Sequence, residues 1–162
     1  MKKTLPLLLA PALALAGFAA APTAFADVVR PAPDFTLAGG KSLRTLRGQP
    51  VVVVIAPSPE SKIFRKQVKR LEADFQGFAA RNTVFIAAFT ESSEGLHSSI
   101  PFSVARDGAK VAAGFGVTAP FSVIVVGKDG NVDLKTDQLS GSWRVRDAIL
   151  NNYENQAAER RL

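Results

Sequence analysis

Three uninterrupted apolar runs, rich in β-branched residues, limit most narrowly the folds that are open to this chain. They occupy residues 51–55, 84–89 and 123–126. A strand with one solvated face alternates apolar and polar residues, whereas a strand covered on both faces is apolar throughout. The runs therefore predict a central sheet with helices on both sides, which is an α/β fold.

The segment between the first two runs predicts an amphipathic helix. Five apolar residues recur there at spacings that place them on one helical face, namely Phe64, Val68, Leu71, Phe75 and Phe78. Ser58 is a suitable N-cap and Pro59 suits the first helical position, so we expect the helix to begin there. A strand, a helix and a second strand in this order predict a right-handed unit with parallel strands.

The second half of the chain predicts a short helix, a hairpin and a last helix. Residues 110–115 have a helical pattern, and the Gly-Lys-Asp-Gly turn at 127–130 joins two strand-like segments. We expect Ser142 to cap the last helix, with five inward contacts: Trp143, Val145, Ala148, Ile149 and Tyr153. The whole order predicts a central mixed sheet, βαβ then ββα, in a single domain over residues 27–162 with a polar tail from about 151.

The first 26 residues predict a cleaved secretory signal peptide. Lys2 and Lys3 precede an apolar stretch, and Ala24, Phe25 and Ala26 form a small-residue cleavage site. A membrane anchor is the alternative, but prolines and a glycine interrupt the stretch, and a spanning helix needs about 20 unbroken apolar residues. We therefore expect cleavage near Ala26, a periplasmic or secreted bacterial protein, and no transmembrane segment in its mature form.

Several short segments share the order and spacing of one large family. They are residues 33–37 (Pro-Asp-Phe-Thr-Leu), 42–48, 107–117, 118–120 and 123–130. Together they span residues 31 to 150 and resemble the thioredoxin-like superfamily, nearest to its peroxiredoxin and thiol-disulfide oxidoreductase branch. The resemblance implies a thioredoxin-like fold with a short N-terminal extension and a cis-proline at Pro120. A looser resemblance, carried by residues 56–58 and 127–130, is to a cysteine-free bacterial family of unknown function, related to domains of animal matrix proteins.

The chain contains no cysteine, which separates it from the chemistry of that branch. The resemblance places the reactive thiols at the start of the long helix, and here Glu60, Ser61 and Phe64 match those positions. A serine hydroxyl neither exchanges with disulfides nor reacts with peroxide as a thiolate does. We therefore expect a redox-inactive member that is not an enzyme.

Two surfaces are candidate binding sites. The first is the groove that the resemblance implies, which five residues would line: Pro57, Ser58, Thr118, Ala119 and Pro120. The alternative is that Pro120 is only a structural turn proline. The second is a basic helix face formed by Lys62, Lys66, Lys69, Arg65 and Arg70. Such a face is either simply solvated or an electrostatic surface for an acidic partner, anionic lipid or cell-wall polymer.

No cofactor, metal or nucleic acid is expected. His97 is the only histidine, and with Glu91 and Glu94 it provides too few fixed ligands for a metal site. The net charge of +6 suits an acidic partner, but no nucleic-acid-binding motif is present. We expect an exported, non-catalytic binding or adaptor protein of the bacterial envelope, whose partner is an envelope protein or an anionic surface. The alternative is a thiol-disulfide oxidoreductase- or peroxiredoxin-related protein whose redox activity is lost or depends on a partner.

Overall fold

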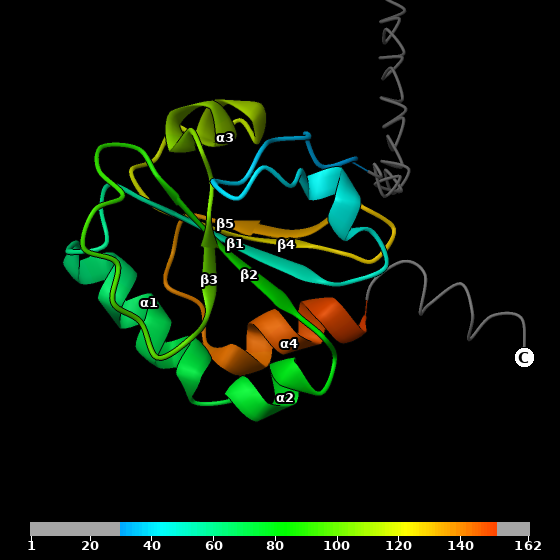
Figure 1. Ribbon diagram of the computed structural model, residues 1–162. Coiled ribbons are helices and arrows are strands. Elements are labelled where there is room, and N and C mark those ends of the chain that lie inside the picture. Colours follow the sequence, from blue (N-terminus) through cyan, green and yellow to red (C-terminus); the bar gives the residue numbers. More distant parts are fainter. Residues whose placement is uncertain (1–29, 152–162) are drawn as a thin grey trace, which may run out of the picture.

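A five-stranded mixed sheet forms the centre of the computed structural model, which describes residues 30–151 (Figure 1). Its strands are β1 (Val51–Ala56), β2 (Val84–Phe89), β3 (Phe102–Val104), β4 (Ser122–Val126) and β5 (Val132–Thr136). They lie in the order β3-β2-β1-β4-β5. β1 is parallel to β2 and β2 to β3, whereas β4 runs antiparallel to both β1 and β5. This confirms the predicted mixed sheet. The predicted signal peptide, Tyr153 and the tail beyond residue 151 lie outside the described residues.

Helices cover both faces of the sheet, as the apolar strands predicted (Figure 1). One face carries α1 (Lys62–Glu72), α2 (Phe75–Ala79) and α4 (Ser142–Leu150). The other carries α3 (Gly108–Gly114), the lead-in from residue 30 and the 3-10 helix η1 (Leu43–Leu46). Among the described residues no helix has the length and apolar character needed to cross a bilayer.

The side chains of β1 divide the core into two clusters. Val52 and Val54 point into the cluster under α1, α2 and α4, whereas Val53 and Ile55 belong to the cluster under α3. The buried residues of both clusters fall between residues 37 and 149. A chain that begins at residue 27 therefore contains the whole of this described core.

The predicted start of the long helix was wrong. α1 begins at Lys62 with Ser61 as its N-cap, not at Ser58. The reason is that the chain leaving β1 stays paired with the segment after β2, since the carbonyl oxygen of Pro57 accepts a hydrogen bond of 3.0 Å from the backbone N–H of Glu91. A turn follows, in which the N–H of Ser61 donates to the carbonyl oxygen of Ser58.

The same helix is also shorter than predicted, because the chain breaks it at Asp74. This residue leaves the helical region, with φ −133°, and α2 begins after it. The apolar face nevertheless continues across the break. Four of its five residues are buried, namely Phe64, Val68, Leu71 and Phe78, and Phe75 is half-buried.

The expectation for Trp143 was wrong. Its side chain is 68% exposed, whereas Val145 and Ile149 are buried. These two residues stand one helical turn apart and define the inner side of α4, so Trp143 projects from another side. Gly141, not Ser142, is the N-cap of α4.

Candidate functional site

The end of the sheet where β1 stops and β4 starts brings together the two segments that the thioredoxin-like resemblance singled out. Ile55 pairs with Ser122 in the antiparallel register of β1 and β4. Continuing that register sets Pro57 opposite Pro120 just beyond the strands. The segment that leads into α1 therefore faces the loop that contains Pro120, as the thioredoxin-like resemblance implied.

The side chains at the start of α1 serve structural purposes. The Ser61 hydroxyl accepts a hydrogen bond of 3.4 Å from the backbone N–H of Phe64 and so caps the helix. The Glu60 carboxylate lies 3.7 Å from the Arg65 guanidinium in an exposed ion pair. Phe64 is fully buried, and its ring packs at 5.0 Å from that of Phe89. In this structure Ser61 is thus a helix cap and Phe64 is a core residue.

The proline loop differs from the implied one. The described peptide bonds include no cis bond, so the Ala119–Pro120 bond is trans and the implied cis-proline was wrong. For a peptide bond that precedes proline, the trans isomer is intrinsically more stable than the cis isomer by about 0.5–1 kcal/mol. Since Pro120 is exposed, no close packing around it opposes this preference.

The predicted groove is only partly assembled. Thr118 and Ala119 line a pocket of about 280 Å³, but its other walls come from residues around the start of β4 and the end of β5, including Ser122, Lys135 and Asp137. Pro57, Ser58 and Pro120 do not line it. Two of its polar side chains are already engaged. The Lys135 ammonium donates to the Phe115 carbonyl oxygen at 3.1 Å, and the Ser122 hydroxyl donates to the Thr136 carbonyl oxygen at 2.9 Å.

The predicted basic face of α1 is present, and all five of its side chains are exposed: Lys62, Arg65, Lys66, Lys69 and Arg70. Arg65 is paired with Glu60, and the Arg70 guanidinium donates to the Leu139 carbonyl oxygen at 3.0 Å. The three lysines form no ion pair with any residue between 30 and 151. Their charges are therefore free to meet a partner. We call these five residues the α1 basic surface.

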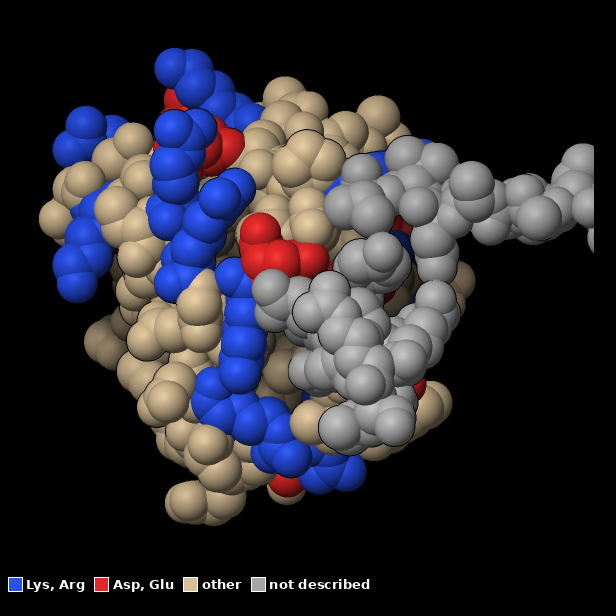
Figure 2. All heavy atoms as spheres, turned by 90° about the vertical axis from the view of Figure 1, so that its right-hand side faces the viewer, with Lys and Arg blue, Asp and Glu red and all other residues tan. Residues whose placement is uncertain are grey.

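A second basic area, which the sequence analysis missed, lies on the face that carries η1. Figure 2 looks at the side of the molecule where η1 lies, and there lysine and arginine side chains form a band with a small group of acidic side chains beside it. Four exposed residues around η1 and the β4–β5 turn contribute to the charge of this region: Lys41, Arg44, Arg47 and Lys128. The area was missed because it joins segments more than 80 residues apart in the chain.

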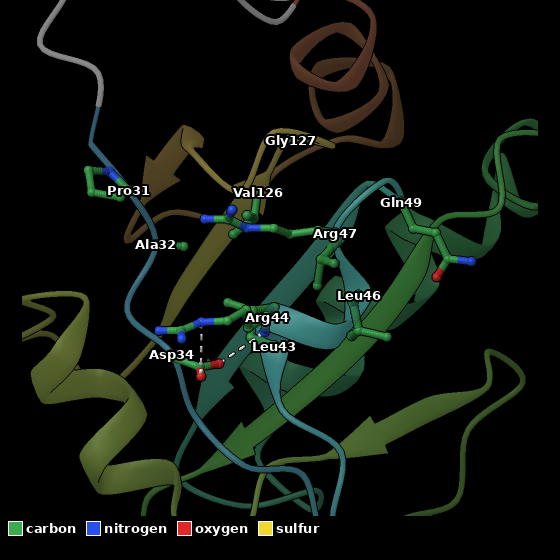
Figure 3. Close-up of a pocket in the computed structure, with 12 residues that line it drawn as sticks. Pro31, Ala32, Asp34, Leu43, Arg44, Leu46, Arg47, Gln49, Val126 and Gly127 are labelled. Atoms are coloured by element: carbon green, nitrogen blue, oxygen red, sulfur yellow. Dashed lines mark hydrogen bonds and ion pairs between the residues drawn. The ribbon is translucent and has the colours of Figure 1, made fainter.

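A pocket of about 170 Å³ opens within this second area (Figure 3). Its apolar walls include Leu43 and Val126, and the side chains of Arg44 and Arg47 extend along it toward the lead-in at Ala32. The Asp34 carboxylate accepts a hydrogen bond of 2.9 Å from the backbone N–H of Arg44, and it lies 3.7 Å from the guanidinium of the same residue. The negative charge of Asp34 thus offsets one of the two arginines.

The described residues contain no group of three histidine or acidic side chains placed to bind a metal ion. His97 is exposed in the loop between β2 and β3.

Comparisons with known proteins agree with this architecture. Residues 28–135 match the family model described as the AhpC/TSA family. No curated protein sequence matches the chain.

Solved structures with a similar fold include thiol:disulfide interchange proteins and a protein with alkyl peroxide reduction activity. A protein from Chlorobium tepidum assigned as the thiol:disulfide interchange protein DsbE shares 17% identity, with a TM-score of 0.59 over 82% of this chain and 92% of that chain. A thiol:disulfide interchange protein from Bacteroides sp. also shares 17% identity, with a TM-score of 0.58 over 81% and 95%. The bacterioferritin comigratory protein of Xanthomonas campestris shares 16% identity, with a TM-score of 0.55 over 78% and 91%. At these identities the similarity is one of fold, which is thioredoxin-like. The family match spans most of the chain, and the chain therefore belongs to the AhpC/TSA family.

Proposed function

We propose that this chain is an exported, redox-silent binding protein of the bacterial envelope, which recognises an acidic partner through the α1 basic surface. One observation carries the proposal. At the helix start where the thioredoxin-like resemblance expects a reactive thiol, this cysteine-free chain has Ser61, and its hydroxyl caps α1.

The chemistry of serine supports the redox-silent part of the proposal. Peroxide reduction and disulfide exchange both proceed through a thiolate, which attacks a peroxide oxygen or a disulfide sulfur. A serine hydroxyl is a far weaker nucleophile at neutral pH, and here it accepts a hydrogen bond from the backbone N–H of Phe64. The fold is thus retained without the group that performs its chemistry, which leaves binding as the simplest use of its surfaces.

The charges on α1 support the choice of surface. Lys62, Lys66 and Lys69 stand on successive turns and meet no carboxylate among the residues described. Clustered exposed charge of one sign steers and retains partners of the opposite sign. The signal-peptide pattern of residues 1–26 supports export, so the partner would be a component of the envelope.

Two charge-reversal variants test the proposal on residues 27–162. The first changes Lys62, Lys66 and Lys69 to Glu. The matched control changes Lys41, Arg106 and Lys128 to Glu, which are exposed residues away from α1 with no side-chain ion pair in the described structure. Each immobilised chain would be exposed to fractionated envelope extract, and retained material would be identified by mass spectrometry.

We expect the unmodified chain and the control to retain the same component, and the α1 variant to lose it. Retention should also weaken as salt rises, because exposed charges are screened within about 10 Å at 0.1 M ionic strength. Equal retention by all three chains would exclude the α1 basic surface, and no retention by any chain would contradict the binding function.

The family match and the thiol-active fold relatives favour a second candidate, an oxidoreductase subunit that acts with a cysteine from a partner. Peroxide consumption and insulin disulfide reduction would be measured for the chain alone and with each retained component. We expect background rates in every case. A rate that needs both the chain and a cysteine-containing partner would establish the second candidate instead.

A further inference from the structure

Two large apolar side chains among the described residues are exposed, and both belong to α4, namely Trp143 and Leu150. Trp143 is 68% exposed, more than any other large apolar residue described, and it is the only tryptophan of the chain. Tryptophan is largely buried on average in folded proteins, and the other described aromatic residues are buried or half-buried, so the exposure of Trp143 sets it apart.

Trp143 follows a turn that is hydrogen-bonded to α1. Gln67 of α1 bonds to the backbone of Ser140 at 2.9 Å, and the Arg70 guanidinium bonds to the carbonyl oxygen of Leu139. The next residue, Gly141, lies directly under the indole, since a Cβ atom there would meet the indole nitrogen at 3.0 Å. The two helices that carry the tryptophan and the basic residues, α4 and α1, thus lie on the same side of the sheet (Figure 1).

The remaining charges on these two helices leave the face cationic. Arg144 adds a further exposed positive charge beside the tryptophan. Arg65 is matched by Glu60, and Arg146 by Asp74 at 2.6 Å. Two further carboxylates are exposed, Glu72 on α1 and Asp147 on α4, against five unmatched cations: Lys62, Lys66, Lys69, Arg70 and Arg144.

We propose that this face docks the protein on an anionic lipid bilayer, with the indole of Trp143 in the headgroup region and the α1 cations over the lipid phosphates. The inference rests on the proposed function and names its partner. Tryptophan favours the membrane–water interface because its ring is apolar and its N–H still finds a polar acceptor there. Lysine and arginine stems lie along such a boundary while their charges reach the phosphates. An anionic bilayer surface uses both features of this face, the positive charges and the exposed indole.

The single tryptophan makes the test specific to this face. Residues 27–162, which include the described core, would be titrated with vesicles of phosphatidylcholine containing 30% phosphatidylglycerol, and with vesicles of phosphatidylcholine alone. Cosedimentation would give the partition coefficient. The emission maximum of Trp143 and its quenching by acrylamide would report whether the indole leaves water.

Binding to the anionic vesicles is expected to shift the emission to shorter wavelength and to reduce acrylamide quenching. Each lysine of α1 changed to Glu should weaken partitioning at least about fivefold, since one basic residue near an anionic surface contributes about 1 kcal/mol. The control with Lys41, Arg106 and Lys128 changed to Glu should bind as the unmodified chain does. The Trp143→Ser variant should sediment less, and circular dichroism would establish that each variant is folded.

Three outcomes would overturn the inference. The first is that the control variant loses as much vesicle binding as the α1 lysine variants. The second is that the chain sediments with the vesicles without any change in Trp143 emission, and the third is that it does not bind anionic vesicles. If the chain does not bind anionic vesicles but still retains an envelope protein through the α1 basic surface, the inference is wrong and the proposed function stands. If both fail, the proposed function is wrong as well.

Discussion

The side-chain amide of Gln67 and the backbone of Ser140 exchange two hydrogen bonds, each 2.9 Å long, across 73 residues of sequence. The Gln67 amide nitrogen donates to the Ser140 carbonyl oxygen, and its amide oxygen accepts from the Ser140 N–H. Both residues are fully buried. This pair fixes α1 against the turn that leads into α4, and so sets the position of Trp143 relative to the α1 basic surface.

The change Gln67→Met should lower the free energy of unfolding by roughly 2–4 kcal/mol. The methionine has a similar volume, but it leaves a buried N–H and a buried carbonyl oxygen of Ser140 without partners, at about 1–3 kcal/mol each. Chemical denaturation followed by circular dichroism would measure the loss. Gln76→Met, at an exposed position of α2, is the control and should change stability little.

The change Ser61→Ala should cost about 1 kcal/mol, because it removes the side chain that caps α1. Ser58→Ala is the informative comparison, since the sequence alone favoured Ser58 as the cap. Its side chain accepts no capping hydrogen bond, so its replacement should have a smaller effect in the same denaturation experiment. A larger loss for Ser58→Ala would contradict the observed helix start.

The change Ser61→Cys tests whether the helix start can still activate a thiol. The N-terminus of α1 should lower the pKa of the introduced thiol below its usual value of about 8.5, because the helix dipole stabilises the thiolate. The neighbouring carboxylate of Glu60 acts in the opposite direction, so Glu60→Gln in the same chain should lower the pKa further. The rate of alkylation by iodoacetamide as a function of pH would give both values. An unshifted pKa in the double variant would show that the helix start no longer favours an anion.

The change Gly108→Ala should destabilise the fold by about 3 kcal/mol or prevent folding. A Cβ atom at this position would lie 2.0 Å from the carbonyl oxygen of Phe89, which is a backbone atom and cannot move aside cheaply. Gly39→Ala is the matched control, because a Cβ atom there meets nothing within 4 Å and the φ angle is not in the positive range. Thermal unfolding of the two variants should differ by many degrees, and similar midpoints would contradict the close approach of α3 to β2.

The elements that the sequence predicted well are those whose own residues determine them. The three apolar runs became β1, β2 and β4, and the Gly-Lys-Asp-Gly turn joins β4 to β5 as expected. β3 went unpredicted because Phe102, Ser103 and Val104 have little strand pattern and form a strand only by pairing with β2. The predicted start of the long helix was wrong for a similar reason. The segment after β2 is distant in sequence, and its hydrogen bonds to Pro57 keep the chain out of a helix until α1 begins.

The candidate sites show the same division. The α1 basic surface follows from one helix and could be predicted from its spacing. The area around η1 could not, because only the fold brings the end of η1 to the β4–β5 turn, where the Gly48 N–H donates to the Lys128 carbonyl oxygen. Trp143 was misplaced because a helical pattern shows which residues share a side, but not which side a single residue at the helix start takes.

The position of β1 between β2 and β4 has a consequence for the growing polypeptide. β1 pairs with β2 along one edge and with β4 along the other, and β4 begins only at Ser122. Until the ribosome has released that segment, a nascent chain holds an uncharged strand of valines and isoleucine with one edge open. Such edges recruit other strands and seed aggregates. Chaperone protection is therefore needed most between the synthesis of β1 and that of β4, and truncations that end before Ser122 should accumulate as insoluble protein.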